Sequence, residues 1–172
     1  MLIAVMMLVP AASGASPQGI PVKSTPFDAK FRFSEEMSGT SQTMKDAAPE
    51  SLKILFFKAK GLRYFKEKGR DHWQTPEETE INGYGDCEDK AIWLFKKLRE
   101  NRYQNARVVV GKLKEGYQGY HAWVEYTDAT GVTHILDAST QAKIWKRQEV
   151  TPSYFVPYFS YDEKIRYMHP VR

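Results

Sequence analysis

The apolar residues of this chain change their spacing once, near residue 105, and that change limits the folds open to it. Before it, two segments repeat apolar residues every three or four positions, as an amphipathic helix does. After it, shorter segments alternate apolar and polar residues or run through β-branched residues, as strands do. Helices followed by successive strands predict an α+β fold with an antiparallel sheet, rather than alternating βαβ units.

The first helix is predicted at Ser51–Lys68, with Ser51 as its N-cap and Gly69 just beyond its end. Asp71–Gly85 follows it and is polar and rich in turn-forming residues. We expect a loop there, with a short helical turn at Pro76–Thr79.

The second helix is predicted at Cys87–Arg102, with Asp86 as its N-cap. One face of this helix carries an apolar stripe, and the basic residues near its end fall largely outside that stripe. The stripe is formed by Cys87, Ala91, Leu94, Phe95 and Leu98.

Strands are predicted at Ala106–Leu113, Tyr120–Thr127 and Val132–Ala138, the last two forming a hairpin. Lys143–Val150 is a further candidate strand. The aromatic tail, Tyr154–Arg172, is expected to be an edge strand or a covering loop.

The start of the chain is expected to be processed. Met1–Pro10 is apolar and uncharged, and the small residues after it suit cleavage at Ala15, so residues 1–15 are predicted to be a signal peptide. The alternative is a buried N-terminal segment. Residues 16–46 lack periodicity and are expected to form an irregular arm, and residues 47–172 to form one domain.

Composition excludes several classes of protein. The net charge is +4, but the basic residues are interspersed with acidic ones, so a nucleic-acid partner is not expected. Beyond the leader, no window is apolar and long enough to predict a membrane span. The single cysteine, Cys87, rules out an intramolecular disulfide and a zinc site that needs several thiolates.

Cys87 is the candidate nucleophile. It opens a helix after a glycine-rich turn, where unpaired backbone N–H groups and the helix dipole favour a thiolate. The alternative is a buried, inert cysteine. A thiol nucleophile needs a base, and if a three-residue hairpin loop follows Thr127, His121 lies directly opposite Asp137. In that register His134 pairs with Val124 on the other face.

Four motifs occur in order: Trp73–Glu77 (WQTPE), Gly83–Ala91 (GYGDCEDKA), Gly119–Trp123 (GYHAW) and Leu136–Asp137. Together they resemble the bacterial transglutaminase-like cysteine peptidases, a group within the transglutaminase-like, papain-related superfamily. The resemblance implies a helix carrying the cysteine, packed on an antiparallel sheet carrying the histidine and the aspartate. It also implies a Cys87-His121-Asp137 triad, a thioester intermediate and an extracytoplasmic setting.

The same resemblance suggests calcium as a ligand of this protein, because some members of the family bind it beside the nucleophile. Asp86 and Glu88 match the acidic positions and are candidate ligands; the alternative is an N-cap and a first-turn acid. The triad chemistry itself requires no cofactor. Lys90 departs from the family, in which an aromatic residue is common, and Ala138 stands where the peptidases often have Asn.

Trp73, Gln74 and Trp123 are weaker candidates for a substrate groove or, in the case of Gln74, for an oxyanion donor. For the two tryptophans, core packing is the alternative. The sequence leaves three functions open: hydrolysis of a protein or peptide of the cell envelope, acyl transfer to an amine, and a non-catalytic binding module with the same fold.

Overall fold

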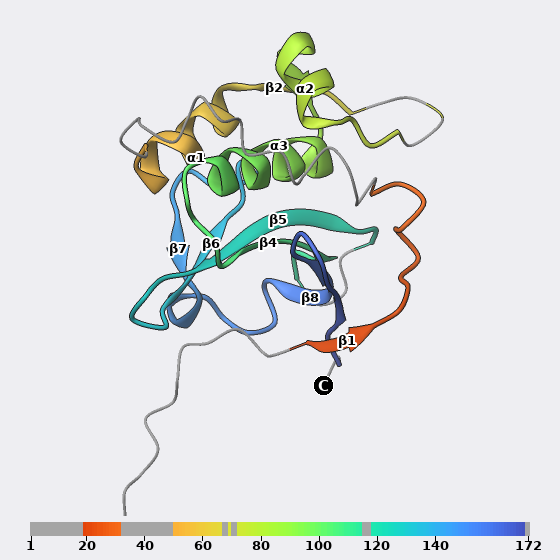
Figure 1. The fold of residues 1–172 in the computed structure, drawn as a ribbon, viewed down its shortest axis with the longest axis vertical. Helices are drawn as coiled ribbons and strands as arrows, with labels where there is room; N and C mark the ends of the chain where they lie inside the picture. Colours follow the sequence, from red (N-terminus) through yellow and green to blue (C-terminus); the bar gives the residue numbers. More distant parts are fainter. Residues whose placement is uncertain (1–18, 32–49, 67–68, 70–71, 115–117, 171–172) are drawn as a thin grey trace, which may run out of the picture.

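The computed structural model describes residues 19–31, 50–66, 69, 72–114 and 118–170, so the predicted signal peptide lies outside the described residues. Three helices lie on one face of a large sheet (Figure 1). They are α1 (Leu52–Gly61), α2 (Pro76–Asn82) and α3 (Cys87–Glu100). This arrangement confirms the predicted α+β class.

Within the described residues the sheet has seven strands in the order β1-β9-β8-β4-β5-β6-β7, and every neighbouring pair is antiparallel. A separate pair of short parallel strands, β2 and β3, lies beside the helices. The strands are β1 (Ile20–Val22), β2 (Arg63–Tyr64), β3 (Tyr84–Gly85), β4 (Ala106–Lys112), β5 (His121–Thr127), β6 (Thr133–Leu136), β7 (Trp145–Lys146), β8 (Val156–Tyr161) and β9 (Arg166–Met168).

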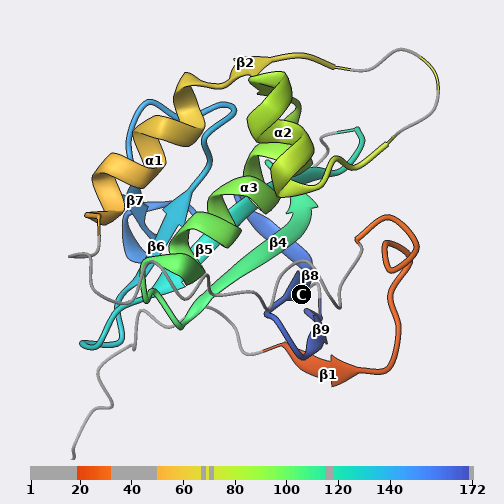
Figure 2. The same cartoon turned by 45° about the horizontal axis from the view of Figure 1, so that its top comes forward.

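Helix α3 lies between the sheet and the other two helices (Figure 2). Its apolar stripe packs on β4 and β5, as predicted, but the opposite side is covered by α1 and α2. Residues Glu88–Lys96 are consequently all buried, including Lys96. Lys96 lies outside the apolar stripe, as predicted, but it is buried all the same, because a helix between two layers has little exposed surface.

Helix α1 is shorter than predicted, and α2 is longer than the short turn predicted at Pro76–Thr79. Ser51 is the N-cap of α1, as expected, but α1 ends at Gly61, because glycine weakens a helix and Leu62 turns to an extended conformation. Helix α2 extends to Asn82, beyond the predicted turn. Thr75 and Glu78 form a capping box at its start, which stabilises a helix that periodicity alone could not reveal.

Lys90, at the position where the resemblance leads us to expect an aromatic residue, is buried in the first turn of α3. Its ammonium group donates to the carbonyl oxygens of Leu62, at 3.0 Å, and Lys60, at 3.5 Å. Burial and the nearby Lys60 lower the pKa of Lys90, whereas the charge of Asp137 raises it. Lys90 thus satisfies carbonyl groups at the end of α1 and joins the two helices.

The β5–β6 hairpin has a longer loop than predicted. Thr127 pairs with Thr133, so five residues lie between the strands, and His134 pairs with Tyr126 instead of Val124. The Asp128 carboxylate stabilises the longer loop by accepting the backbone N–H groups of Thr130 and Val132. The predicted register is wrong by two positions, an even shift that leaves each side chain on its predicted face.

Both ends of the described chain contribute more to the sheet than expected. β8 lies between β4 and β9 and is not an edge strand, while β7 has only two residues. The N-terminal segment provides strand β1, and its Phe27 and Phe31 are buried in the main core. Strand pairing between residues far apart in sequence, which local patterns do not reveal, explains these differences.

A second, smaller cluster of apolar residues covers the sheet face opposite the helices; its buried members are Val109, Trp123, Ile135 and Phe155. Among the described helices, none has the length and apolar composition needed to cross a membrane.

Candidate active site

The loop before α3 is held by one buried carboxylate, that of Asp89. It accepts the Gln74 backbone N–H at 2.8 Å, the Gln74 side-chain amide at 3.0 Å and the Asp86 backbone N–H at 3.1 Å. Gly85 passes so close that an added Cβ would lie 2.5 Å from the Asp89 Cβ, so only glycine fits there. Asp89 therefore fixes the turn that delivers Cys87 to the start of α3.

Gln74 and the two tryptophans lie within the packed structure. The Gln74 side chain donates to Asp89 and accepts from Asn82, which anchors α2 to α3. Trp73 and Trp123 are 7% and 0% exposed, so they pack in the two cores and do not wall an open groove. The oxyanion role of Gln74 remains a prediction.

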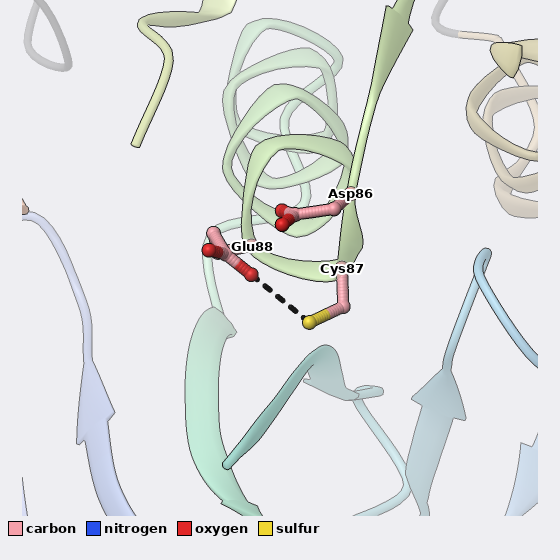
Figure 3. A group of neighbouring side chains, drawn as sticks. All are labelled: Asp86, Cys87 and Glu88. Carbon is pink, nitrogen blue, oxygen red and sulfur yellow. Dashed lines mark hydrogen bonds between the residues drawn. The ribbon is translucent and has the colours of Figure 1, made fainter. Parts of the chain in front are cut away.

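The Cys87 thiol has acidic surroundings. It donates to Glu88 Oε2, 3.0 Å away, at the first turn of α3 (Figure 3). Burial and the charge of Glu88 raise the pKa of the thiol, and the Ala122 backbone N–H opposes this by donating to the sulfur. The expectation that the helix start favours a thiolate is therefore wrong for this arrangement, because burial and a neighbouring carboxylate outweigh the helix dipole.

Asp86 and Glu88 lie close together beside the thiol. One ligand atom from each of Asp86, Cys87 and Glu88 lies within 4.8 Å of the others. Burial, a hydrogen bond with Asp86 and the charge of Asp86 raise the pKa of Glu88 to about 9. A buried carboxyl group and a half-buried one beside it, which cannot both ionise easily, are a chemical fit for a divalent cation with oxygen ligands, which would compensate both charges.

His121 and Asp137 form a buried pair. His121 Nε2 lies 2.9 Å from Asp137 Oδ2. Asp137 also accepts the backbone N–H groups of Ser139 and Thr140, at 3.0 and 3.1 Å, and the Thr140 hydroxyl. Burial alone would raise the pKa of Asp137, but the hydrogen bonds and the nearby imidazole together hold it below its ordinary value.

The contact between His121 and Asp137 follows from the face on which they lie and not from direct pairing. The observed register makes them diagonal neighbours beyond the last paired residues of β6.

The thiol and the imidazole lie at opposite faces of β5. Cys87 contacts the Ala122 amide from the α3 side, while His121 shares the other face with Trp123. The thiol and the imidazole–carboxylate pair therefore approach the same end of one strand from its two faces.

Sequence reasoning missed the role of Asp89. The signal was present, because Asp89 is the last acid of the GDCED motif and Gln74 belongs to the WQTPE motif. Both motifs had been considered for chemistry at the cysteine, whereas the structure links them to each other.

Comparison with solved structures gives two informative matches. EGTA-treated LapG of Legionella pneumophila matches with a TM-score of 0.60 and 22% identity, over 70% of this chain and 67% of LapG. Calcium-bound LapG matches with a TM-score of 0.56 and 22% identity, over 73% of this chain and 72% of LapG.

The chain has the LapG fold. LapG is a transglutaminase-like cysteine protease, so the resemblance predicted from the motifs is confirmed at the level of the fold. No protein-family model and no curated protein sequence matches the chain. At this level of identity the comparison establishes architecture, and the chemistry has to be argued from the residues.

Asp89→Asn should destabilise the protein, because the amide cannot accept all three N–H groups and each buried donor left unpaired costs about 1–3 kcal/mol. Urea unfolding measures the loss. Asp162→Asn is the control, since Asp162 accepts the backbone N–H groups of Lys164 and Ile165 in an exposed turn. Equal losses for the two variants would contradict the role assigned to Asp89.

Asp137 should make stability depend on acid pH. Its folded-state pKa lies below the ordinary value of 3.8, so its charge stabilises the fold above that pH. This contribution is lost as the pH falls through the folded-state pKa. The free energy of unfolding of wild type minus that of Asp137→Asn should therefore shrink from pH 6 to pH 2.5 in urea titrations. A difference that stays constant over this range would show that the charge of Asp137 is not involved.

Proposed function

We propose that the protein is an extracytoplasmic cysteine hydrolase that cleaves an amide bond in a protein or peptide of the cell envelope. Cys87 is the nucleophile, His121 the base and Asp137 the residue that orients the base. The observation that carries the proposal is that the His121–Asp137 pair and the Cys87 sulfur reach adjacent residues of β5 in a chain with the LapG fold. The leader predicted at residues 1–15 supports the extracytoplasmic setting.

The hydrogen bond to Asp137 assigns the two nitrogens of His121. A neutral imidazole that donates Nε2–H to Asp137 has Nδ1 left as the acceptor for the thiol proton. The thiolate then attacks the substrate carbonyl, and the imidazolium passes its proton to the leaving amine. Water, deprotonated by His121, cleaves the thioester and releases the acid.

The Cys87 backbone N–H is in the first turn of α3, where an N–H group has no partner within the helix. It is a donor for the oxyanion that forms when the carbonyl is attacked, a contribution worth about 3 kcal/mol in other enzymes.

Calcium is part of the proposal as a bound ion. Asp86 and Glu88 would supply carboxylate oxygens, and Cys87 would not bind it, because calcium prefers hard oxygen ligands. When bound, the ion would offset the negative charge that raises the pKa of the thiol. LapG has been observed both calcium-bound and EGTA-treated, which supports testing this ion first.

A second candidate is a non-catalytic binding module. The observation that favours it is the hydrogen bond that the Cys87 thiol donates to Glu88, because a thiol that donates to a carboxyl group keeps its proton. Acyl transfer to an amine shares the triad with hydrolysis and differs in the product.

Cleavage of a peptide library derived from a bacterial proteome, read by mass spectrometry, tests the function. Cys87→Ala should abolish cleavage, and His121→Ala should lower its rate by about 10²–10⁴-fold. His134→Ala is the matched control, because His134 also binds an aspartate, with Nε2 2.8 Å from Asp128 Oδ2, and should leave cleavage unchanged.

The products separate the three functions. New peptide termini indicate hydrolysis, and joined peptides with ammonia release indicate acyl transfer. Wild-type protein that produces neither contradicts the enzyme proposal and leaves the binding module.

Calcium should raise the melting temperature of the wild-type protein relative to the same protein in EGTA. At a concentration 100 times Kd the ion adds about 2.7 kcal/mol, roughly 5–10 °C for a domain of this size. Glu88→Gln and Asp86→Asn should reduce the shift, and Glu77→Gln, an exposed acid of α2, should not. A wild-type melting temperature that is the same in calcium and EGTA would exclude the ion site.

A further inference from the structure

We propose that Tyr120 contacts the substrate and selects peptides with an apolar side chain close to the scissile bond, an inference that rests on the proposed function. Tyr120 directly precedes His121, and its side chain is 55% exposed. The tryptophans first considered as groove walls are buried, so they cannot serve in its place. An exposed aromatic side chain beside a candidate catalytic residue is available to contact a substrate.

Tyr120 directly precedes β5 and lies on the same side of the sheet as the nucleophile. Its ring meets Phe27, and both Phe27 and Cys87 belong to the core on the α3 side of the sheet. The sulfur meets the N–H of Ala122, two residues further along the chain. Two strand residues span roughly 7 Å, which is also the length of two residues of an extended peptide. A peptide with its carbonyl at Cys87 would therefore place a residue one or two positions from the scissile bond against Tyr120.

Neighbouring aromatic rings hold Tyr120 in position. Its ring meets Phe27 edge-on, with centroids 5.1 Å apart, and Tyr158 edge-on at 6.0 Å. Phe27 in turn stacks on Trp73 at 5.5 Å. In Figures 1 and 2 the segment that carries Phe27 lies at the end of the sheet where β5 begins. A ring fixed in this way loses little conformational entropy when it binds a ligand.

The chemistry of this surface indicates the kind of side chain it accepts. Aromatic rings offer apolar faces and polarised edges, which suit aliphatic and aromatic groups. The Lys112 ammonium lies 5.8 Å from the centre of the Tyr158 ring. This cation disfavours a basic substrate side chain at the same position, so we assign the site to apolar residues.

Cleavage-site profiling of the proteome-derived peptide library tests the inference with Tyr120→Ala. The variant should lose the preference for apolar residues within two positions of the cleaved bond, and kcat/KM for peptides that carry them should fall by roughly 3- to 10-fold. Tyr120→Phe should restore both. Tyr154→Ala is the matched control, because Tyr154 is also exposed, at 39%, and also meets a phenylalanine ring edge-on.

Alkylation of Cys87 by iodoacetamide separates substrate contact from damage to the nucleophile. This small reagent does not need Tyr120, so its rate should agree between wild type and Tyr120→Ala within about twofold. Unchanged cleavage preference and rate in Tyr120→Ala, with an active wild type, would overturn this inference alone. A wild type that cleaves no peptide would overturn the proposed function, and this inference with it.

Discussion

The buried carboxylate of Asp89 is the interaction on which the rest of the site depends. A charge removed from water must be compensated, and three N–H groups from Gln74 and Asp86 provide that compensation. Because these donors come from two segments, the carboxylate joins the loop before α2 to the first turn of α3. The position of Cys87 is therefore fixed by a neighbour two residues away that has no part in the proposed chemistry.

The pKa values of Asp137 and Glu88 shift in opposite directions because the groups around the two carboxylates differ. Asp137 accepts N–H and O–H groups and faces an imidazole, so its charged form is stabilised despite burial. Glu88 faces another carboxyl group and a thiol, so burial disfavours its charge and raises its pKa. Asp137 thus orients His121, the proposed base, whereas the carboxyl groups beside Cys87 disfavour the thiolate form of the proposed nucleophile. A cation at Asp86 and Glu88 would offset this effect on the thiol.

Much of the fold could be predicted, and each error has a physical cause. The α+β class, the Ser51 and Asp86 caps and the β4 and β5 strands follow from local patterns. The end of α1, the length of the hairpin loop and the position of β8 do not, because each depends on contacts with distant residues. The contact between His121 and Asp137 was predicted from an incorrect register and is present because face alternation survives a shift of two residues.

Local chemistry alone was enough to single out Cys87, His121 and Asp137 and to indicate the fold that carries them, because spacing, caps and motif order are local properties. Tertiary structure decided the environment of those residues. It placed the thiol against Glu88, buried Lys90 against the end of α1 and left Tyr120 exposed beside His121. These outcomes depend on which groups share a buried space, and residues that are distant in sequence become neighbours there only after the chain has packed.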